Sequence, residues 1–339
     1  MSEFHVEAVR VNEINPHPNA DRLGITRVLD YPVIVASGEF QEGDLAVYVP
    51  VDALVPADDP RWEFLAKGQS AKAHGIPGTQ LYYRIRAVKL RGTFSMGLLT
   101  RAPEGLAPGD DARMALRVEK YEPPEPVSTS GEDERDPGFL PNYDVEALRR
   151  WPGVLVPGEE VVVSEKLHGC NGRWAWHDDR LWVASRTTFK APPPEGAPGP
   201  VWWRAAVQYD MASRLRDLGP YAFYGEVYGP VQDMKYGMDR GALKIAIFDV
   251  LNTQTRVWLD FEAAFEVAKA AGLPWVPILY AGPWDESLRS WAEGQTTISG
   301  AAHVREGIVI RLPRERYQEG LGRVLLKLHG EGFLTRKGG

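Results

Sequence analysis

The sequence predicts an α+β fold in two domains, and three observations lead to this prediction. Residues 1–118 contain short strand-like runs separated by turn signals, as in small β-barrels. Residues 119–138 are rich in proline and acidic residues and predict a linker. In residues 139–339, strand-like runs alternate with segments of helical period. We therefore expect a β-barrel, a linker, and a larger domain of antiparallel sheets with flanking helices.

The composition is typical of a soluble globular protein. A chain of 339 residues that is 44% hydrophobic and 25% charged can bury substantial cores. It has no apolar run of about 18 residues and no signal-peptide pattern at its start, so the cytoplasm is the expected compartment. The single cysteine, Cys170, excludes an intramolecular disulfide and a cysteine-cluster zinc site. We interpret Cys170 as a small packing residue.

The formal net charge of −7 is unevenly distributed. Residues 119–138 carry seven acids and two bases, a charge of −5, which leaves −2 for the rest of the chain. A nearly neutral body can still carry a basic face. Charge alone therefore neither supports nor excludes a nucleic-acid partner.

Six strand-like runs are expected in the barrel region: Val6–Val11, Ile25–Leu29, Val33–Ala36, Leu45–Val49, Tyr82–Lys89 and Leu98–Leu99. Residues 122–131 are mostly proline and polar residues, which cannot bury enough apolar surface to become ordered, so the domain boundary is expected there. A second proline-rich stretch, 191–200, predicts a surface loop. Beyond the boundary, helices are expected at Val207–Leu218 and Phe261–Ala271.

Two segments of the barrel region resemble the OB-fold tRNA-binding domains that are attached to several synthetases. They are Pro16–Leu23 and Lys89–Gly97, and the resemblance covers roughly residues 4–115. It implies a nucleic-acid-binding domain at 1–118, because OB barrels usually follow single strands or a nucleic-acid backbone. Both segments could instead be turns and closure strands of a barrel that binds no ligand.

Lys166 is placed as a nucleophile would be. It follows the apolar run Val161–Val163, which predicts a buried strand, and it precedes a turn with Gly169 and Gly172. Desolvation there would favour a neutral, attacking amine. The Lys-x-x-Gly pattern by itself is a weak signal.

Six segments in order resemble the motifs of the covalent nucleotidyltransferase superfamily, which includes DNA ligases, RNA ligases and mRNA capping enzymes. They are Lys166–Gly169, Ser185–Arg186, Phe223–Gly229, Ile247–Asp249, Arg305–Arg311 and Leu325–Lys327. The chemistry needs such residues independently of the resemblance. Forming a lysyl phosphoramidate requires a deprotonated lysine, a metal that neutralises phosphate charge, and cations on the departing pyrophosphate.

The resemblance implies a role for each matching residue. Lys166 would be the catalytic nucleophile and would carry AMP, Glu306 and Glu226 would bind Mg²⁺ or Mn²⁺, and Phe248 would stack on the purine. Glu226 could also contact a ribose hydroxyl or a metal-bound water, and Lys327 the α-phosphate. The other expected nucleotide-binding residues are Glu165, His168, Gly169, Asn171, Arg173, Arg186 and His329. Simpler interpretations are salt bridges for the two carboxylates, core packing for Phe248, and solvated positions for Lys327, Arg186, Asn171 and Arg173.

Within the superfamily, the chain resembles the Deinococcus-type RNA ligases, and its segments 165–171 and 223–232 are also similar to the phage-type nick-sealing and editing RNA ligases. Only twelve residues follow Lys327, the OB-like domain comes first, and His168 replaces the acid of the usual Lys-x-Asp-Gly. This resemblance implies that residues 139–339 are an adenylyltransferase domain of an ATP-dependent RNA ligase. Such an enzyme seals 3'-OH/5'-phosphate breaks through a lysyl-AMP and an AMP-capped 5'-end. Its substrates would be nicked duplexes with RNA on the 3'-OH side, which suits RNA repair.

One departure and two alternatives remain at this point. His329 stands where relatives often have a second lysine, so its contact with phosphate would be pH-sensitive. The chain could be an RNA-binding module whose nucleotidyltransferase domain is inactive, or a capping-type guanylyltransferase. No membrane and no protein partner are expected.

Overall fold

The computed structural model describes residues 4–73, 80–122 and 131–336, which form two compact units. The smaller unit contains residues 4–122, 149–152 and 334–336, and the larger contains 131–148 and 153–333. The centre of the expected linker, residues 123–130, lies outside the described residues. Its two ends form short strands, β12 (Glu119–Lys120) and β13 (Asp133–Glu134).

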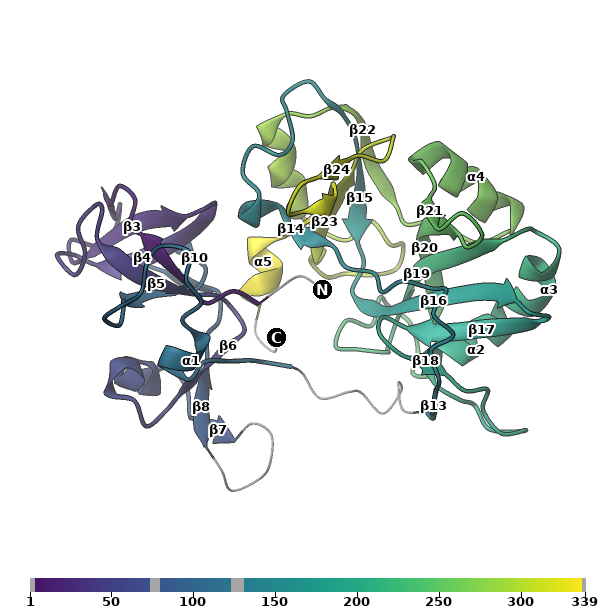
Figure 1. The fold of residues 1–339 in the computed structure, drawn as a ribbon, viewed down its shortest axis with the longest axis horizontal. Helices are drawn as coiled ribbons and strands as arrows, with labels where there is room; N and C mark the ends of the chain where they lie inside the picture. The colour runs from purple at the N-terminus through teal and green to yellow at the C-terminus, as the bar shows by residue number, and fades with distance from the viewer. Residues whose placement is uncertain (1–3, 74–79, 123–130, 337–339) are drawn as a thin grey trace. The chain divides into compact units, whose positions relative to one another are not determined.

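Figure 1 shows strand β5 (Leu45–Val49) among the strands of the smaller unit. It separates two apolar cores. Because side chains alternate along a strand, Val47 and Val49 enter one core while Ala46 and Tyr48 enter the other. This explains why the strand is an unbroken apolar run. The remaining strands are β1 (Glu7–Arg10), β2 (Asn15–Pro16), β3 (Leu23–Val28), β4 (Tyr31–Ala36), β6 (Ala53–Pro56), β7 (Lys72–Ala73), β8 (Leu81–Arg84), β9 (Val88–Leu90), β10 (Thr93–Ser95) and β11 (Leu98–Arg101).

The strands of this unit form four small sheets, with orders β1-β5-β11, β2-β3-β4, β9-β10 and β12-β6-β8-β7. A 3-10 helix, η1 (Pro60–Lys67), and a short α-helix, α1 (Arg113–Leu116), pack against one core. The expected strand Tyr82–Lys89 is wrong as a single element. The chain leaves β6 after Ile85, which still bonds to Ala53, and then pairs with β10 as a separate strand.

The larger unit is built on two sheets. The first has the order β13-β18-β17-β16-β19-β20-β21 and the second has the order β14-β26-β23-β15-β22. All strand pairs in them are antiparallel except β14 with β26. The new strands are β14 (Glu146–Ala147), β15 (Glu160–Lys166), β16 (Gly169–His177), β17 (Arg180–Ser185), β18 (Phe189–Lys190), β19 (Tyr221–Tyr228), β20 (Lys244–Asn252), β21 (Val257–Trp258), β22 (Ile278–Pro283), β23 (Gly307–Arg311) and β26 (Leu325–His329), with the separate hairpin β24 (Tyr317–Gln318) and β25 (Gly322–Arg323).

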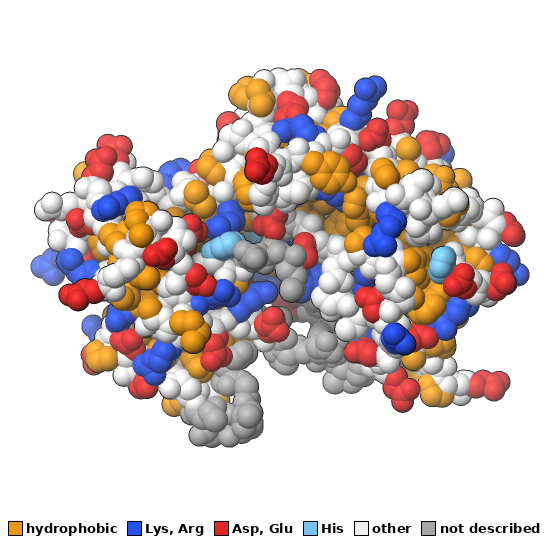
Figure 2. All heavy atoms as spheres, in the orientation of Figure 1, with side chains coloured by type: hydrophobic (Ala, Val, Ile, Leu, Met, Phe, Trp, Pro, Cys, Tyr) orange, Lys and Arg blue, Asp and Glu red, His pale blue; other side chains and the backbone are white. Residues whose placement is uncertain are grey.

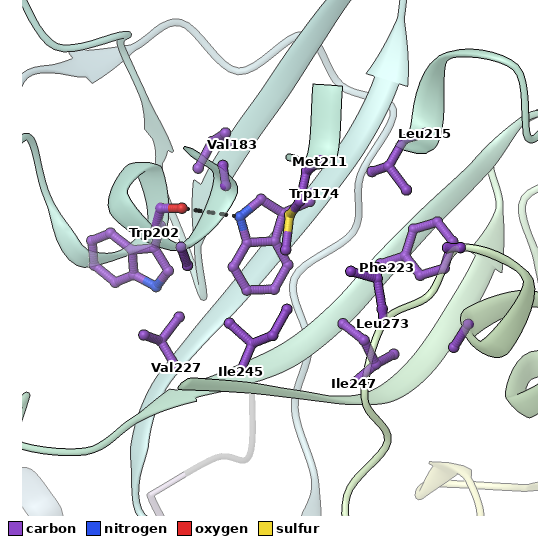
Figure 3. Packing of buried hydrophobic residues seen from close by; sticks show 14 of the residues in the cluster. Trp174, Val183, Trp202, Met211, Leu215, Phe223, Val227, Ile245, Ile247 and Leu273 are labelled. Atoms are coloured by element: carbon purple, nitrogen blue, oxygen red, sulfur yellow. Dashed lines mark hydrogen bonds between the residues drawn. The ribbon is translucent and has the colours of Figure 1, made fainter. Parts of the chain in front are cut away.

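Helices cover one face of the seven-stranded sheet. Figure 3 shows the core between them, in which Trp174, Phe223 and Ile245 from the strands meet Met211 and Leu215 from a helix. The helices are α2 (Val201–Gln208), α3 (Met211–Arg216) and α4 (Phe261–Ala270). Two 3-10 helices, η3 (Leu148–Arg150) and η4 (Glu286–Ala292), and the short helix α5 (Glu331–Leu334) complete the described chain.

The expected helix at 261–271 is confirmed as α4, but the expected helix at 207–218 is wrong. Two helices meet there, because Asp210 has a φ of +47°, which no α-helix can continue through. The periodicity survives the break because Ala205, Met211 and Leu215 face the same core.

The opposite face of the seven-stranded sheet packs on the second sheet. Ala175, Tyr224 and Leu251 share a core with Leu325 and Val309 of β26 and β23. Alternation along each strand therefore decides which side chains enter the space between the sheets. Asn171 and Glu226 have the parity of this inner face, as do Lys327 and His329 on β26.

Acidic and basic side chains are interspersed over the visible face of each unit (Figure 2). This pattern agrees with the nearly neutral charge of the chain outside 119–138.

Candidate active site

Lys166 is the last residue of β15, as expected from the apolar run before it. Strand pairing places it opposite Gly307 of β23, and Gly307 lies opposite His329 of β26. Three adjacent strands thus deliver Lys166, Glu306 and His329 to one end of the second sheet. The site therefore depends on the pairing of strands that lie far apart in the sequence.

Glu306 is the centre of the site and is almost completely buried. Lys166 Nζ donates a hydrogen bond of 2.7 Å to its Oε1, and His329 Nε2 lies 3.3 Å from the same oxygen. His168 Nδ1 lies 3.3 Å from Oε2. Although burial alone would raise the pKa of Glu306, these three neighbours hold it well below its usual range, so the carboxylate is ionised.

The pKa of Lys166 corrects an expectation from the sequence. Burial lowers it, but the charges of Glu306 and Glu226 outweigh burial and raise the pKa above the ordinary 10.5. In this state the amine is an ammonium ion paired with Glu306, not the neutral nucleophile that desolvation alone predicted. The sequence argument considered burial and omitted the partner that the neighbouring strand supplies.

Two further ionisable groups, Lys327 and Glu226, have pKa values that are strongly shifted in the direction that favours the neutral form. Burial lowers the pKa of Lys327 to about 8, and the charge of Lys166 lowers it further. Burial raises the pKa of Glu226 to about 8, although Lys166 counteracts this. Strongly shifted pKa values are concentrated at functional sites, where burial and neighbouring charges adjust the protonation of the reacting groups.

Phe248 occupies a β-bulge. Tyr224 pairs with Asp249 and Gly225 with Ile247, so Phe248 is the extra residue of β20. A bulge redirects a side chain and is common beside active sites. The Phe248 ring lies 4.8 Å from the ring of Tyr143, and Arg311 Nη1 donates to the carbonyl that the bulge leaves unpaired. The ring is only partly buried, which leaves it available to a ligand.

The donors suit a divalent cation that also binds phosphate. In the described parts of the chain, no three His, Cys, Asp or Glu side chains are arranged to hold a metal by themselves. Mg²⁺ usually binds through one or two carboxylates together with substrate phosphates, so the carboxylates of Glu306 and Glu226 are a sufficient protein contribution. The buried Oε2 of Glu306 has only the ion-pair contact with His168 Nδ1 at 3.3 Å, without hydrogen-bond geometry, so it retains capacity to bind a cation.

Two of the expected nucleotide-binding residues make hydrogen bonds within the protein. Arg173 is fully buried, and its guanidinium donates to the carbonyls of Ser185, Leu140 and Pro141, while its Nη2 has no hydrogen-bond partner among the described residues. The Glu165 carboxylate points away from Lys166, since successive strand residues face opposite sides. It accepts hydrogen bonds from Thr296 and Thr297.

The other expected residues lie where a ligand could reach them. Asn171 is opposite Glu226 in the sheet, and its buried Oδ1 has no hydrogen-bond partner. Gly169 begins β16, where a Cβ would lie 2.1 Å from the carbonyl oxygen of Val227. Arg186 is exposed and pairs with Asp144 at 3.2 Å.

Three residues with no predicted role contact the turn after Lys166. They belong to the connection between β19 and β20 and are Gln232, Asp233 and Tyr236. Gln232 ends the segment that is similar to phage-type ligases, whereas no local sequence signal identifies Asp233 and Tyr236.

Comparison with known proteins first supports the class of the larger unit, a nucleotidyltransferase domain, and then its family. An RNA ligase family model matches residues 159–329, about half of the chain, and this range includes Lys166, Glu226, Glu306 and His329. The chain belongs to the RNA ligase family. An OB-fold domain model matches residues 6–102, which confirms the fold expected for the smaller unit. A search of curated proteins finds no match.

Solved structures of Naegleria gruberi RNA ligase share the fold over nearly the whole chain. A variant with ATP and Mn is 22% identical, with a TM-score of 0.81, and the match covers 97% of this chain and 98% of that one. A variant with AMP and Mn and the ligase with PPi are each 23% identical, with TM-scores of 0.83 and coverage of 98% of both chains. None of the helices in the described residues is both long and apolar enough to cross a bilayer.

Proposed function

We propose that this protein is an ATP-dependent RNA ligase that works through a lysyl-AMP intermediate on Lys166. The observation that carries the proposal is the ion pair between Lys166 and the buried Glu306, inside the region that matches the RNA ligase family. The similar Naegleria gruberi ligase was solved with ATP and Mn, with AMP and Mn, and with PPi, and these ligands correspond to a lysine adenylylation reaction.

In the first step, Lys166 Nζ attacks the α-phosphorus of ATP. The new N–P bond replaces the bond to the bridging oxygen, and pyrophosphate leaves with those electrons. Lys166 must lose a proton beforehand. Burial of Lys166 favours this loss, whereas the charges of Glu306 and Glu226 oppose it. A divalent cation on Glu306 and Glu226 would supply neutralisation of the phosphate charge.

AMP then passes from Lys166 to a 5'-phosphate, and a 3'-hydroxyl displaces it to seal the strand. We propose nicked duplexes with RNA on the 3'-OH side as the substrate, and the Deinococcus type as the kind of RNA ligase. The support is the order of the domains and His168 in place of an acid. A protein can recognise such duplexes by their A-form geometry and 2'-hydroxyls without reading base sequence.

The smaller unit, in this proposal, binds the nucleic acid. Residues 64–103 contain seven lysines and arginines and no acid, in a chain whose net charge is −7. Within this stretch, Arg86, Lys89 and Arg91 are exposed on and beside the β9–β10 hairpin. The two segments that resembled tRNA-binding domains meet there, because His17 Nε2 and Asn19 Nδ2 contact the carbonyls of Leu90 and Arg91 at 3.1 and 3.0 Å. We place the protein in the cytoplasm, where a reduced Cys170 is expected.

The test is covalent labelling. Wild type and Lys166→Ala are incubated with α-labelled ATP or GTP and Mn²⁺ or Mg²⁺, and then separated on a denaturing gel. We expect label from ATP in wild type only. Label from GTP would instead favour a capping-type guanylyltransferase. The absence of label in folded protein free of bound AMP would leave an RNA-binding module with an inactive domain.

A further inference from the structure

A short segment between β19 and β20 is bound to the turn that follows Lys166. Gln232 Nε2 donates to the carbonyl of Gly169 at 2.6 Å. The hydroxyl oxygen of Tyr236 accepts the backbone N–H of His168 at 2.7 Å, and Asp233 Oδ1 lies 2.5 Å from His168 Nε2. The hydrogen bonds of Gln232 and Tyr236 thus hold the backbone of Gly169 and His168, where the chain passes from the second sheet to the first.

Tyr236 reaches this turn from a strained backbone conformation. Its φ is +52°, in the left-handed region that an aromatic residue rarely adopts. Such strain persists only where the surroundings fix it, commonly at functional sites.

The surroundings of Tyr236 do fix it. Its side chain is almost fully buried, and its ring packs at 5.1 Å from the ring of Tyr228 and 4.5 Å from that of His303. The next residue, Gly237, has a φ of +68°, and a Cβ there would lie 2.1 Å from the carbonyl oxygen of Gly300. Packing thus holds both the ring of Tyr236 and the backbone of the next residue, Gly237.

We propose that Gln232 and Tyr236 are positioning residues that hold the turn 167–169, and through it Lys166, in the geometry required for attack on the nucleotide. The inference rests on the proposed lysine adenylylation for its catalytic consequence. Lys166 ends one strand and Gly169 begins the next, so a loose turn would let the nucleophile move relative to Glu226 and Asn171 on the other sheet. A displacement of about 1 Å can cost about 100-fold in rate.

The experiment compares Tyr236→Phe with Tyr228→Phe. Both changes delete one buried hydroxyl from adjacent rings, but the Tyr228 hydroxyl makes no hydrogen bond to residues 167–169. We expect single-turnover labelling of Lys166 at saturating ATP to slow by about tenfold in Tyr236→Phe, because a hydrogen bond that positions the nucleophile is lost. Tyr228→Phe should label at the wild-type rate, and both variants should remain folded at the assay temperature, as checked by their melting curves.

Gln232→Met is the second variant, since it keeps the length of the side chain and removes the donor to Gly169. Its labelling should also slow by about tenfold at saturating ATP. Equal rates in wild type and Tyr236→Phe, or equal slowing in Tyr236→Phe and Tyr228→Phe, would overturn the proposal.

Hydrogen exchange separates this inference from the proposed function. The His168 amide should exchange faster in Tyr236→Phe than in wild type and Tyr228→Phe, whether or not the protein reacts with ATP. Unchanged exchange would refute the positioning role even in an active ligase. Faster exchange with no ATP labelling of wild type would support the structural contact and reject the ligase reaction.

Discussion

At the scale of single residues, His329 is the departure with the clearest chemical consequence. Burial lowers its pKa below the ordinary 6.5, so it is neutral at pH 7 and above, whereas a lysine there would be charged. If the charge assists phosphate binding, His329→Lys should label with ATP several-fold faster than wild type at pH 8. At pH 6 the difference should be smaller. Labelling rates measured from pH 5.5 to 9 test this, and coincident profiles would show that charge at this position is unimportant.

Glu226 predicts a dependence of stability on pH. Burial raises its pKa from the ordinary 4.5 to about 8, so the folded protein binds a proton that the unfolded chain releases. The resulting stability is complete below about pH 4.5 and is lost as the pH rises through 8. Over that range the loss should be on the order of 3 kcal/mol, after allowance for partial exposure. The melting temperature of Glu226→Gln should therefore exceed that of wild type at pH 9 and not at pH 5, and parallel curves would contradict the assignment.

At the scale of secondary-structure elements, one buried carboxylate connects three strands. Asp249 of β20 lies 3.4 Å from Arg311 of β23 and 2.9 Å from Arg323 of β25, and it accepts a hydrogen bond of 2.9 Å from Tyr143. Asp249→Asn would remove one of the two carboxylates that Arg311 and Arg323 share, the other being Glu315. We expect a loss of about 1.5–3 kcal/mol in urea denaturation, the usual contribution of a hydrogen bond to a charged group.

The control for Asp249→Asn is Glu266→Gln, which breaks the exposed pair with Lys269 on α4. Exposed pairs of this kind contribute only about 0.3–0.5 kcal/mol. Similar losses in the two variants would mean that the buried network does not join the sheets.

The secondary-structure elements also show how much of the fold could be predicted from the sequence. Local patterns sufficed for β15 with Lys166 at its end, for α4, and for the two-domain order, because alternation and helical period are properties of short segments. They failed at Asp210, where one residue divides a helix, and at Tyr82–Lys89, where one strand-like run serves two sheets. Those outcomes depend on partners distant in the sequence.

The candidate site was predictable to the same extent. Its catalytic residue types could be found by their order along the chain, but the ion pair of Lys166 with Glu306 arises from strand pairing. The burial of Arg173 and the contacts of Tyr236 depend on tertiary packing, which single-sequence patterns do not contain.

At the scale of the whole molecule, a nearly neutral protein must bind a polyanion through a local basic surface. The exposed residues Arg86, Lys89 and Arg91 are candidates, and Arg86 and Arg91 form no ion pair with other described residues. Each lysine or arginine that contacts a phosphate contributes about 0.7–0.9 to the slope of log K against log salt concentration. Alanine at all three positions should therefore reduce that slope by about 2–3.

The binding measurement uses a nicked RNA duplex and a Lys166→Ala background, so that no turnover occurs. The matched control replaces Arg27, Arg113 and Arg117 by alanine. These arginines are equally exposed, but each is already paired with an aspartate at 2.6–2.9 Å. This control variant removes the same formal charge from the same unit and should leave the slope nearly unchanged. If both triple variants reduce the slope equally, the unit attracts RNA only through its net charge, and the hairpin has no special part in binding.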